Sequence, residues 1–479
     1  MHSSPVSREA LPSALDPGTA APDRSSGRPT ILVATCLASF LPPFMSSALN
    51  LATPALSADL HASAVQVNWI VSAFLVASAS CLLPFGRLGD LLGRKRLFIV
   101  GMASYAACSA ACGLAPSAAT LIALRVAQGA GGAIGFASSL AILTSAYPQG
   151  QRGRVLGINT AAVYTGLSLG PVIGGMLTQQ LGWRSIFFVS AVLGVPAVLL
   201  MVIWVPEEWR GEHTDGYDAA GALLWAASLA ALLAGISTLR ALDVGRWLVL
   251  TGAAGVAAFV VRELRVTHPI LELGLFRNVV FALSNLAALI NYSATFAVTF
   301  LLSLHLQAVR GLAPQSAGAI LLIQPVLMAV LSPLAGRLSD RVEPRLVASA
   351  GMALTSLALI LFAHLGSASP LGAVASGLAL IGVGFGLFSS PNTNAVMSAV
   401  QTRSYGVAAA TLGTMRQVGQ AFSMSIVALV FAQVMGSARI ARANAPLILA
   451  SSHAIFTFLA ALCIAGVFAS LARGRIQRR

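Results

Sequence analysis

Charged side chains are scarce in this sequence of 479 residues. They make up 9% of the chain and apolar residues make up 57%, whereas about 25% of the residues in soluble proteins are charged. The apolar residues come in runs of about twenty, the length that a helix needs to cross a bilayer. These runs lack both the polar face of a surface helix and the alternation of barrel strands. A soluble fold and a membrane barrel are therefore excluded.

Carboxylates and metal ligands are also few. The chain has 15 Asp and Glu residues, and all of them fall in predicted tails, turns or helix ends. The five cysteines lie in predicted spans, where small apolar fillers are the simplest interpretation. Cys108 and Cys112 share a helix face, but a metal site would need further ligands nearby. Because a membrane-embedded enzyme needs convergent titratable or metal-binding groups, we expect neither an enzyme nor a bound metal or cofactor.

Fourteen apolar stretches predict an all-α integral membrane protein, because a helix satisfies its backbone polar groups internally, as hydrocarbon requires. Their approximate limits are 31–53, 66–86, 97–115, 119–145, 155–178, 184–205, 218–239, 247–263, 278–304, 315–335, 345–367, 371–398, 407–435 and 452–472. The connections are short, so consecutive helices should pack antiparallel.

Basic residues are unevenly distributed over the turns. If the N-terminus lies inside, the inner segments hold 21 of the 29 Lys and Arg residues, the outer turns hold six, and Arg125 and Arg416 fall inside spans. The positive-inside rule then places both termini in the cytoplasm. The net charge of +14 needs no nucleic-acid partner, since inner loops beside anionic lipid headgroups would show the same excess.

Residues 1–29 are rich in Ser, Pro and Ala, and we expect them to form a disordered cytoplasmic tail. They do not resemble a signal peptide, because the apolar run that follows is too long and leads into further spans. A transport-like sensor or scaffold would carry a sizeable soluble domain, and this tail is the longest soluble stretch that the spans leave.

A short basic motif occurs twice in the turns between spans. The copies read Gly86-Arg87-Leu88-Gly89-Asp90-Leu91-Leu92-Gly93-Arg94-Lys95 and Gly336-Arg337-Leu338-Ser339-Asp340-Arg341-Val342-Glu343-Pro344-Arg345. An internal repeat in a chain of spans indicates a transporter, because alternating access is built from two related halves.

The first copy resembles the loop signature of the major facilitator superfamily, and the chain from Ile31 to Ala472 resembles its fourteen-helix drug:proton antiporter family. The resemblance implies two six-helix bundles with two inserted helices, and a motif that holds the cytoplasmic side shut. Its glycines would let helix ends approach closely, and Asp90 would face a helix N-terminus. The residues that match this gating motif are Gly86, Gly89, Asp90, Gly93, Arg94, Gly336, Arg337 and Asp340. Leu91 stands where an Arg is usual and Glu343 replaces a Gly, so the second latch should be the weaker one.

The fourth span carries Arg125, Gln128 and Gly129 in the spacing of the family's R-x-x-Q-G motif. A charge inside a span is expensive and usually functional, and Arg125 shares a helix face with Gln128. The alternative is an Arg that snorkels to the interface, since it lies about six residues into its span.

The fifth span resembles the motif that marks antiporters, and hence exporters, within the superfamily. Its small-residue stripe allows a close helix approach, and its proline kinks the helix. The matching residues are Gly166, Gly170, Pro171, Gly174 and Gly175. Glycines alone would indicate only packing.

The first span departs from the family, because Met45 stands where an Asp is usual. Proton coupling normally uses an intramembrane carboxylate, and an Arg cannot replace it because it stays charged. His305 lies near the outer end of its span, where an interfacial role is the simplest interpretation. Two functions therefore stay open: a proton-linked exporter of small amphipathic compounds, or an uncoupled or differently coupled facilitator of an anionic or neutral metabolite.

The lack of carboxylates within the spans favours a neutral or anionic cargo over a dication. We expect the cavity and its coupling position to be lined by a set of mostly polar residues, although each Asn and Gln could instead make an interhelical hydrogen bond. The set is Met45, Asn50, Arg125, Gln128, Tyr164, Asn291, Tyr292, Gln324, Asn392, Asn394, Arg416 and Gln417.

These features predict an N-terminal bundle over residues 30–206, an insert with its linkers over 207–277, a C-terminal bundle over 278–474 and a basic cytoplasmic tail over 475–479. We expect a monomeric multi-pass exporter in a bacterial cytoplasmic membrane. Its partners would be a small drug-like, antibiotic-like or metabolite cargo, protons and membrane lipids.

The charge distribution makes a topological prediction. Reporter fusions at Asp16 and Arg479 should both report a cytoplasmic location, because the basic residues concentrate on the side of the termini. Two extracytoplasmic readings would contradict the orientation, and a map with twelve crossings would contradict the fourteen-helix assignment.

Overall fold

A computed structural model describes residues 28–210, 216–239, 243–339, 341–401 and 405–474. Within these residues, 14 helices are long and apolar enough to span a membrane, which confirms the predicted number of spans. Residues 1–27 of the predicted N-terminal tail, the C-terminal tail and Asp340 lie outside the described residues. Residues 28 and 29, also assigned to the tail, instead belong to the first helix.

The helices fall into two sets of six spans with an intervening pair. The first set is α1 (Arg28–Asp59), α2 (Ala64–Leu92), α3 (Arg94–Gly113), α4 (Ala118–Ala146), α5 (Gln149–Leu181) and α6 (Arg184–Trp204). The pair is α7 (Ala219–Thr238) and α8 (Val244–Glu263), followed by the short η1 (Leu273–Arg277). The second set is α9 (Val279–Leu304), α10 (Pro314–Leu321) with α11 (Ile323–Ser339), α12 (Pro344–Ala363), α13 (Leu371–Ser398), α14 (Tyr405–Val434) and α15 (Ala445–Ala472). Two short turns, η2 (His305–Val309) and η4 (Arg442–Asn444), complete the described elements.

Polar residues fix the first turns of several of these apolar helices. Ser63 and Gln66 form a capping box at the start of α2, in which each side chain bonds the other residue's backbone N–H. The Ser117 hydroxyl accepts a hydrogen bond from the Thr120 N–H at the start of α4. Such caps satisfy N–H groups that have no partner within the helix.

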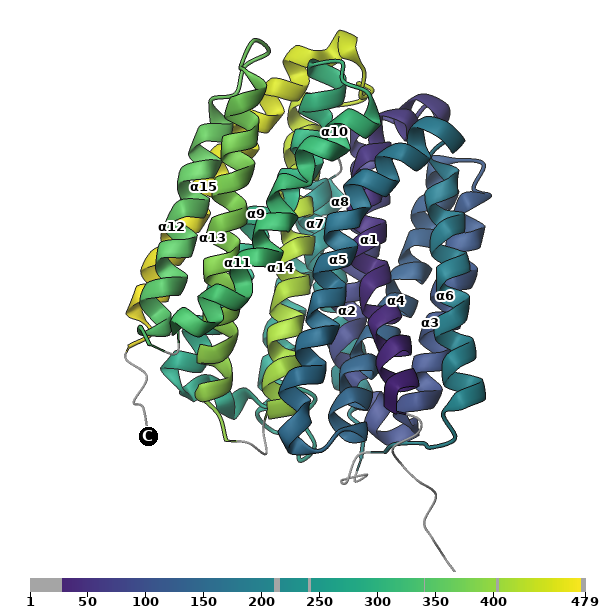
Figure 1. The fold of residues 1–479 in the computed structure, drawn as a ribbon, viewed down its shortest axis with the longest axis vertical. Coiled ribbons are helices and arrows are strands. Elements are labelled where there is room, and N and C mark those ends of the chain that lie inside the picture. The colour runs from purple at the N-terminus through teal and green to yellow at the C-terminus, as the bar shows by residue number, and fades with distance from the viewer. Residues whose placement is uncertain (1–27, 211–215, 240–242, 340, 402–404, 475–479) are drawn as a thin grey trace, which may run out of the picture.

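The two sets pack their helices in the same pattern. In the first set α1 packs on α5 and α6, and α4 packs on α2 and α3. In the second set α9 packs on α14 and α15, and α13 packs on α11 and α12. The sets meet through α1 with α9, α2 with α14, and α5 with α10 and α11, while α7 lies against both α2 and α14 (Figure 1). The sequence repeat therefore corresponds to a repeat in the fold.

Helix α1 begins and α15 ends at the same end of the molecule (Figure 1). We call this the terminal end and the opposite one the far end. The described residues of both copies of the basic motif lie at the terminal end, since one copy begins in the last turns of α2 and the other in the last turn of α11.

Several predicted helix boundaries were wrong by four to seven residues, among them the end of α1, the end of α2 and the starts of α5 and α15. Helix α1 continues through Pro54 to Asp59. Pro54 has no N–H to offer the Asn50 carbonyl, but this carbonyl accepts hydrogen bonds from the Thr53 hydroxyl at 2.9 Å and the Ser303 hydroxyl at 2.6 Å. Helix α15 starts at Ala445 rather than near 452, because a proline occupies its first turn, where the missing N–H is no loss.

The small residues of α5 allow it to approach α1 of its own set and α10 of the second set closely. A Cβ atom on Gly170 would lie 2.6 Å from the Ser47 Cβ of α1, and one on Gly174 would lie 2.5 Å from the Ala48 Cα. Gly166 lies similarly close to the Phe40 carbonyl, and a Cβ on Gly175 would lie 2.7 Å from the Pro314 carbonyl oxygen of α10.

Pro171 of α5 leaves the Leu167 carbonyl without its helical donor. The Ser47 hydroxyl of α1 donates to that carbonyl at 3.1 Å. On the other side of α5, Gly318 of α10 packs directly against the Pro171 carbonyl, too closely to admit a Cβ atom. Pro171 therefore lies at the point where α1, α5 and α10 meet.

Gly318→Ala should separate α5 from α10 and destabilise the protein by about 1–3 kcal/mol, the range for overpacking in a filled core. Thermal unfolding of the detergent-purified protein measures this. Gly372→Ala on α13 is the matched control, because nothing lies within 4 Å of its added Cβ. Equal melting temperatures for the two variants would contradict the close approach.

Candidate functional site

A central pocket lies between the two sets of helices. Its lining comes from α1, α5, α9, α11, α13 and α14 and consists of Ser46, Ser47, Asn50, Leu167, Tyr292, Thr295, Phe296, Thr299, Gln324, Met328, Phe385 and Gln420. None of these residues is charged, and the polar groups are amides and hydroxyls. The cavity volume is about 80 Å³. Sites for drug-sized ligands enclose about 300–1,000 Å³, so the pocket must widen to admit a cargo of that size.

Polar contacts join the two sets of helices on both sides of the pocket. Toward the far end, the Gln307 amide donates to the Leu51 carbonyl at 3.1 Å, next to the bond between Ser303 and Asn50. The Ala64 N–H also donates to the Ala438 carbonyl at 3.0 Å.

Toward the terminal end, a second layer of contacts crosses between the sets. The Tyr164 and Ser389 hydroxyls lie 3.0 Å apart, and the Gln417 amide donates to the Ser78 hydroxyl at 3.2 Å. These contacts lie about one helical turn from the pocket lining, on its terminal side.

The structure brings only part of the predicted cavity set together. Asn50, Tyr292 and Gln324 line the pocket. Tyr164 and Gln417 instead belong to the layer of contacts on its terminal side. The others lie outside this lining, and they are Met45, Arg125, Gln128, Asn291, Asn392, Asn394 and Arg416. Seven of the lining residues are Ser, Thr, Phe or Gln residues that the sequence analysis did not single out, because such residues are common in membrane helices.

Arg125 is buried inside the first set of helices, with 1% of its surface exposed, so it does not snorkel. Its Nε donates to the Ile70 carbonyl at 2.9 Å and its Nη1 to the Gln128 side-chain oxygen at 2.5 Å. The guanidinium lies 4.5 Å from the centre of the Phe74 ring. Gln128 donates onward to the Ser109 hydroxyl at 2.6 Å. The R-x-x-Q pair therefore ties α2, α3 and α4 together.

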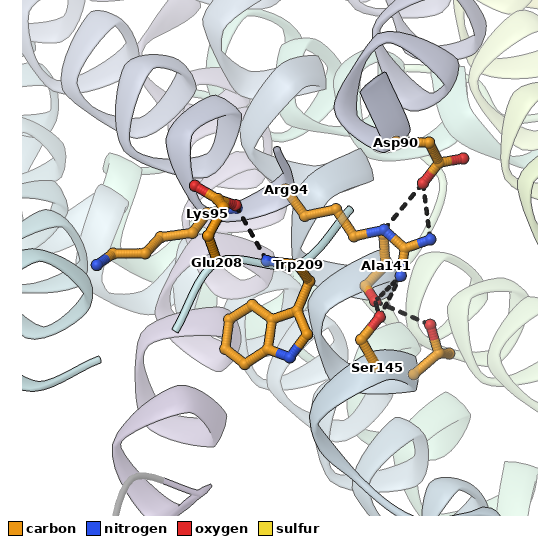
Figure 2. Close-up of polar contacts among 8 residues, drawn as sticks. Asp90, Arg94, Lys95, Ala141, Ser145, Glu208 and Trp209 are labelled. Atoms are coloured by element: carbon orange, nitrogen blue, oxygen red, sulfur yellow. Dashed lines mark hydrogen bonds and ion pairs between the residues drawn. The ribbon is translucent and has the colours of Figure 1, made fainter. Parts of the chain in front are cut away.

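The first basic motif forms an ion pair at the terminal end (Figure 2). One oxygen of the Asp90 carboxylate accepts bonds from Arg94 Nε at 2.9 Å and Nη2 at 2.7 Å. Arg94 Nη1 donates to the Ala141 carbonyl of α4 at 3.1 Å and to the Ser145 hydroxyl. Among the described residues, these recorded partners all belong to the first set of helices.

The segment after α6 caps this motif, which the sequence analysis did not anticipate. The Glu208 carboxylate accepts hydrogen bonds from the backbone N–H of Lys95 at 2.8 Å and of Arg96 at 3.2 Å, at the start of α3. Figure 2 shows Glu208 next to Lys95. A carboxylate is favourable at a helix N-terminus. Gly93 has a φ of +111°, and a Cβ there would lie 2.6 Å from the Glu208 carboxyl carbon. Only glycine combines this backbone with so close an approach.

The rest of both motif copies is less tightly bonded. Gly86 and Gly89 have ordinary contacts with Ala137 and Leu97. In the second copy Gly336 packs against the Ser390 hydroxyl, and Arg337 is exposed. Glu343 forms an ion pair with Arg345 at 3.2 Å, and the matching Asp340 lies outside the described residues.

Carboxylates of the described residues stay at helix ends and turns, as expected. Asp218, which caps α7, is the most completely bonded of them: it accepts from the Gly221 N–H at 2.9 Å and pairs with Arg262 at 2.6 Å. The Arg262 guanidinium holds the pKa of Asp218 below its usual range.

Two basic side chains are more buried than the sequence predicted. His305 is buried, with 3% of its surface exposed, rather than interfacial, because η2 continues α9 and keeps the ring inside. Arg473 follows the last predicted span, which ends at residue 472, but it is 2% exposed and donates to Asn392, Ser284 and Ser470. No local pattern marks Arg473, since its partners come from three different helices.

Comparisons with known proteins agree on one family. The model of the Major Facilitator Superfamily matches residues 35–424. The riboflavin transporter RibZ of Clostridioides difficile is 29% identical over 440 residues, which cover 91% of this chain and 95% of that protein. The multidrug resistance protein Stp of Mycobacterium tuberculosis is 32% identical over 412 residues, covering 84% and 75%. The tetracenomycin C resistance and export protein of Streptomyces glaucescens is 30% identical over 428 residues, covering 88% and 80%.

Solved structures show the same fold. A bacterial homologue of the human lysosomal transporter Spinster, in an inward-facing and occupied conformation, superposes with a TM-score of 0.67. The alignment covers 94% of this chain and 97% of that one, at 15% identity.

Asp90→Asn should strongly reduce transport while the protein still reaches the membrane, because the ion pair with Arg94 is lost and the shape is kept. Asp340→Asn should have a smaller effect, since its motif is already altered at Glu343. Vesicle transport normalised to the amount of protein in the membrane measures both. The control is Asp243→Asn, which removes an exposed carboxylate elsewhere; equal losses at positions 90 and 340, or none at 90, would refute a gating role.

Proposed function

The chain belongs to the Major Facilitator Superfamily and is a multi-pass membrane transporter, and from this premise we propose that it exports small amphipathic compounds by alternating access. The observation that carries the proposal is the central pocket between two similarly packed sets of helices, whose lining has aromatic, hydroxyl and amide groups and no charge. Such a lining suits neutral or anionic drug-like or metabolite cargo better than a cation, which would need a buried carboxylate.

The direction and location of transport belong to the same proposal. The basic residues concentrate at the terminal end, which supports a cytoplasmic terminal end in a bacterial cytoplasmic membrane. The antiporter motif and the names of the relatives Stp and the tetracenomycin C exporter support export rather than uptake. The name of RibZ supports a metabolite as an alternative cargo.

The driving force has two candidates. Relationship to the drug:proton antiporters supports proton exchange. The second candidate is an uncoupled or differently coupled exporter, which is favoured by the Met45 position and by the absence of a carboxylate in the middle of any described span. Met45 is fully buried, and its thioether does not ionise, so it cannot carry a proton in place of the Asp.

Everted vesicles test the function, since export then appears as uptake. Riboflavin, which is neutral, and 6-hydroxy-2-naphthoate, which is anionic, should accumulate, whereas the cation ethidium should not. Vesicles that contain Asp90→Asn are the matched control. Accumulation of ethidium alone would contradict the proposed cargo class.

The same vesicles separate the two driving forces. For an exporter without proton coupling, collapsing the pH gradient at a fixed membrane potential should leave riboflavin uptake unchanged. Met45→Asp should then introduce a dependence on pH, because a carboxylate in the first span can titrate. Uptake by the unmodified protein that stops when the gradient collapses would instead establish proton coupling through another group, and His305 would be the first to examine.

A further inference from the structure

Arg416 lies next to the central pocket without lining it. It precedes Gln420, a lining residue, by one turn of α14, so the two share a helix face. The rise of a helix places Arg416 about 6 Å nearer the terminal end. Its guanidinium lies 5.5 Å from the centre of the Tyr292 ring, and Tyr292 also lines the pocket.

The charge of Arg416 has no counter-charge among the described residues. The ion pairs recorded there join Asp90, Glu208, Asp59, Asp218 and Glu343 to other arginines. Arg416 Nη2 donates to the Thr393 hydroxyl at 3.0 Å, and its buried Nε has no hydrogen-bond partner within the described structure. Leaving a charged donor unbonded at this depth is costly.

Arg125 shows how this fold can enclose an arginine within one set of helices. That side chain also lacks a carboxylate partner, but a carbonyl, an amide oxygen and the Phe74 ring enclose it completely. Arg416 is only partly buried and lies at the level of the contacts around Tyr164 and Gln417, on the terminal side of the pocket.

The pocket itself presents unused acceptors. The side-chain oxygens of Asn50 and Gln324 are buried without a donor, and these residues are 3% and 6% exposed. Tyr292 and Phe385 form an edge-to-face pair with ring centres 5.1 Å apart, and Phe296 adds a third aromatic group to the lining. Aromatic walls with amide acceptors suit a planar ring that carries O–H or N–H donors.

We propose that Arg416 binds a carboxylate or similar oxyanion of the cargo, while the uncharged pocket holds its aromatic, donor-bearing body. The cargo is then an amphipathic aromatic acid, oriented with its anionic end toward the terminal end. An arginine suits this role because its planar donors match a carboxylate. The inference rests on the proposed export function and makes an anionic cargo the preferred one among the neutral and anionic compounds.

Two probes that differ only in charge test the site. Binding of 6-hydroxy-2-naphthoate and of the neutral 6-hydroxy-2-naphthamide to the detergent-purified protein is followed by probe fluorescence. The unmodified protein should bind the naphthoate on the order of tenfold more tightly, the effect expected of one charge-assisted bond. Arg416→Gln should remove this preference by weakening the naphthoate alone, and Arg416→Lys should restore part of it.

Arg310→Gln is the charge-matched control and should leave the preference intact, because Arg310 lies in a far-end turn and donates to the Ser367 carbonyl. The proposal is overturned if the unmodified protein binds both probes equally or binds neither. It is also overturned if the preference survives Arg416→Gln or is lost only in Arg125→Gln. Riboflavin uptake into everted vesicles distinguishes failure of the anion site from failure of the export function. If uptake persists while the preference for the naphthoate is absent, only the anion site is refuted. If no probe is taken up, export is refuted.

Discussion

A backbone carbonyl within hydrocarbon must find a donor, and this constraint shapes the contacts between helices beside the central pocket. Pro54 and Pro171 each remove the N–H that a carbonyl one turn earlier would receive. The freed carbonyl of Asn50 takes the hydroxyl of Ser303 from α9, and that of Leu167 takes the hydroxyl of Ser47 from α1. The prolines thus turn an internal defect into contacts between helices, beside residues that line the central pocket.

The few charged groups of the described residues are also met by polar partners. Carboxylates of the described residues stay at helix ends, where arginines or backbone N–H groups meet them, as Glu208 meets the start of α3. Arg125 and Arg473 lie inside the protein and are bonded by neutral carbonyls, amides and hydroxyls. The Nε of Arg416, like that of Arg473, has no hydrogen-bond partner among the described residues, but Arg416 differs in lying beside the central pocket. A charge within a membrane tends to mark a functional site.

The two sets of helices share a packing pattern, but the first copy of the basic motif is more extensively hydrogen-bonded than the second. At the terminal end, the first motif copy is a closed network of Asp90, Arg94 and the α4 backbone, capped by the segment that leads to α7. Because α7 also packs on α2 and α14, the inserted helices contact both sets. A movement of one set against the other, which alternating access requires, would therefore be transmitted to the insert and to the segment beside the motif.

Sequence alone was sufficient for the class of the protein, the number of spans, the repeat and the family, because each depends on local patterns: apolar runs of membrane length, short motifs and the glycine stripe of α5. It also located Asn50, Tyr292 and Gln324 at the pocket and Arg125 beside Gln128. Other outcomes required the tertiary structure. Whether α1 would continue beyond Pro54 depended on a donor from α9, more than 250 residues away, and the burial of Arg473 depended on three helices. The different surroundings of Arg125 and Arg416 could not be read from the chain, because both are single arginines in apolar helices. Only the packing of neighbouring helices decides which one is enclosed and which one keeps a buried Nε without a hydrogen-bond partner among the described residues.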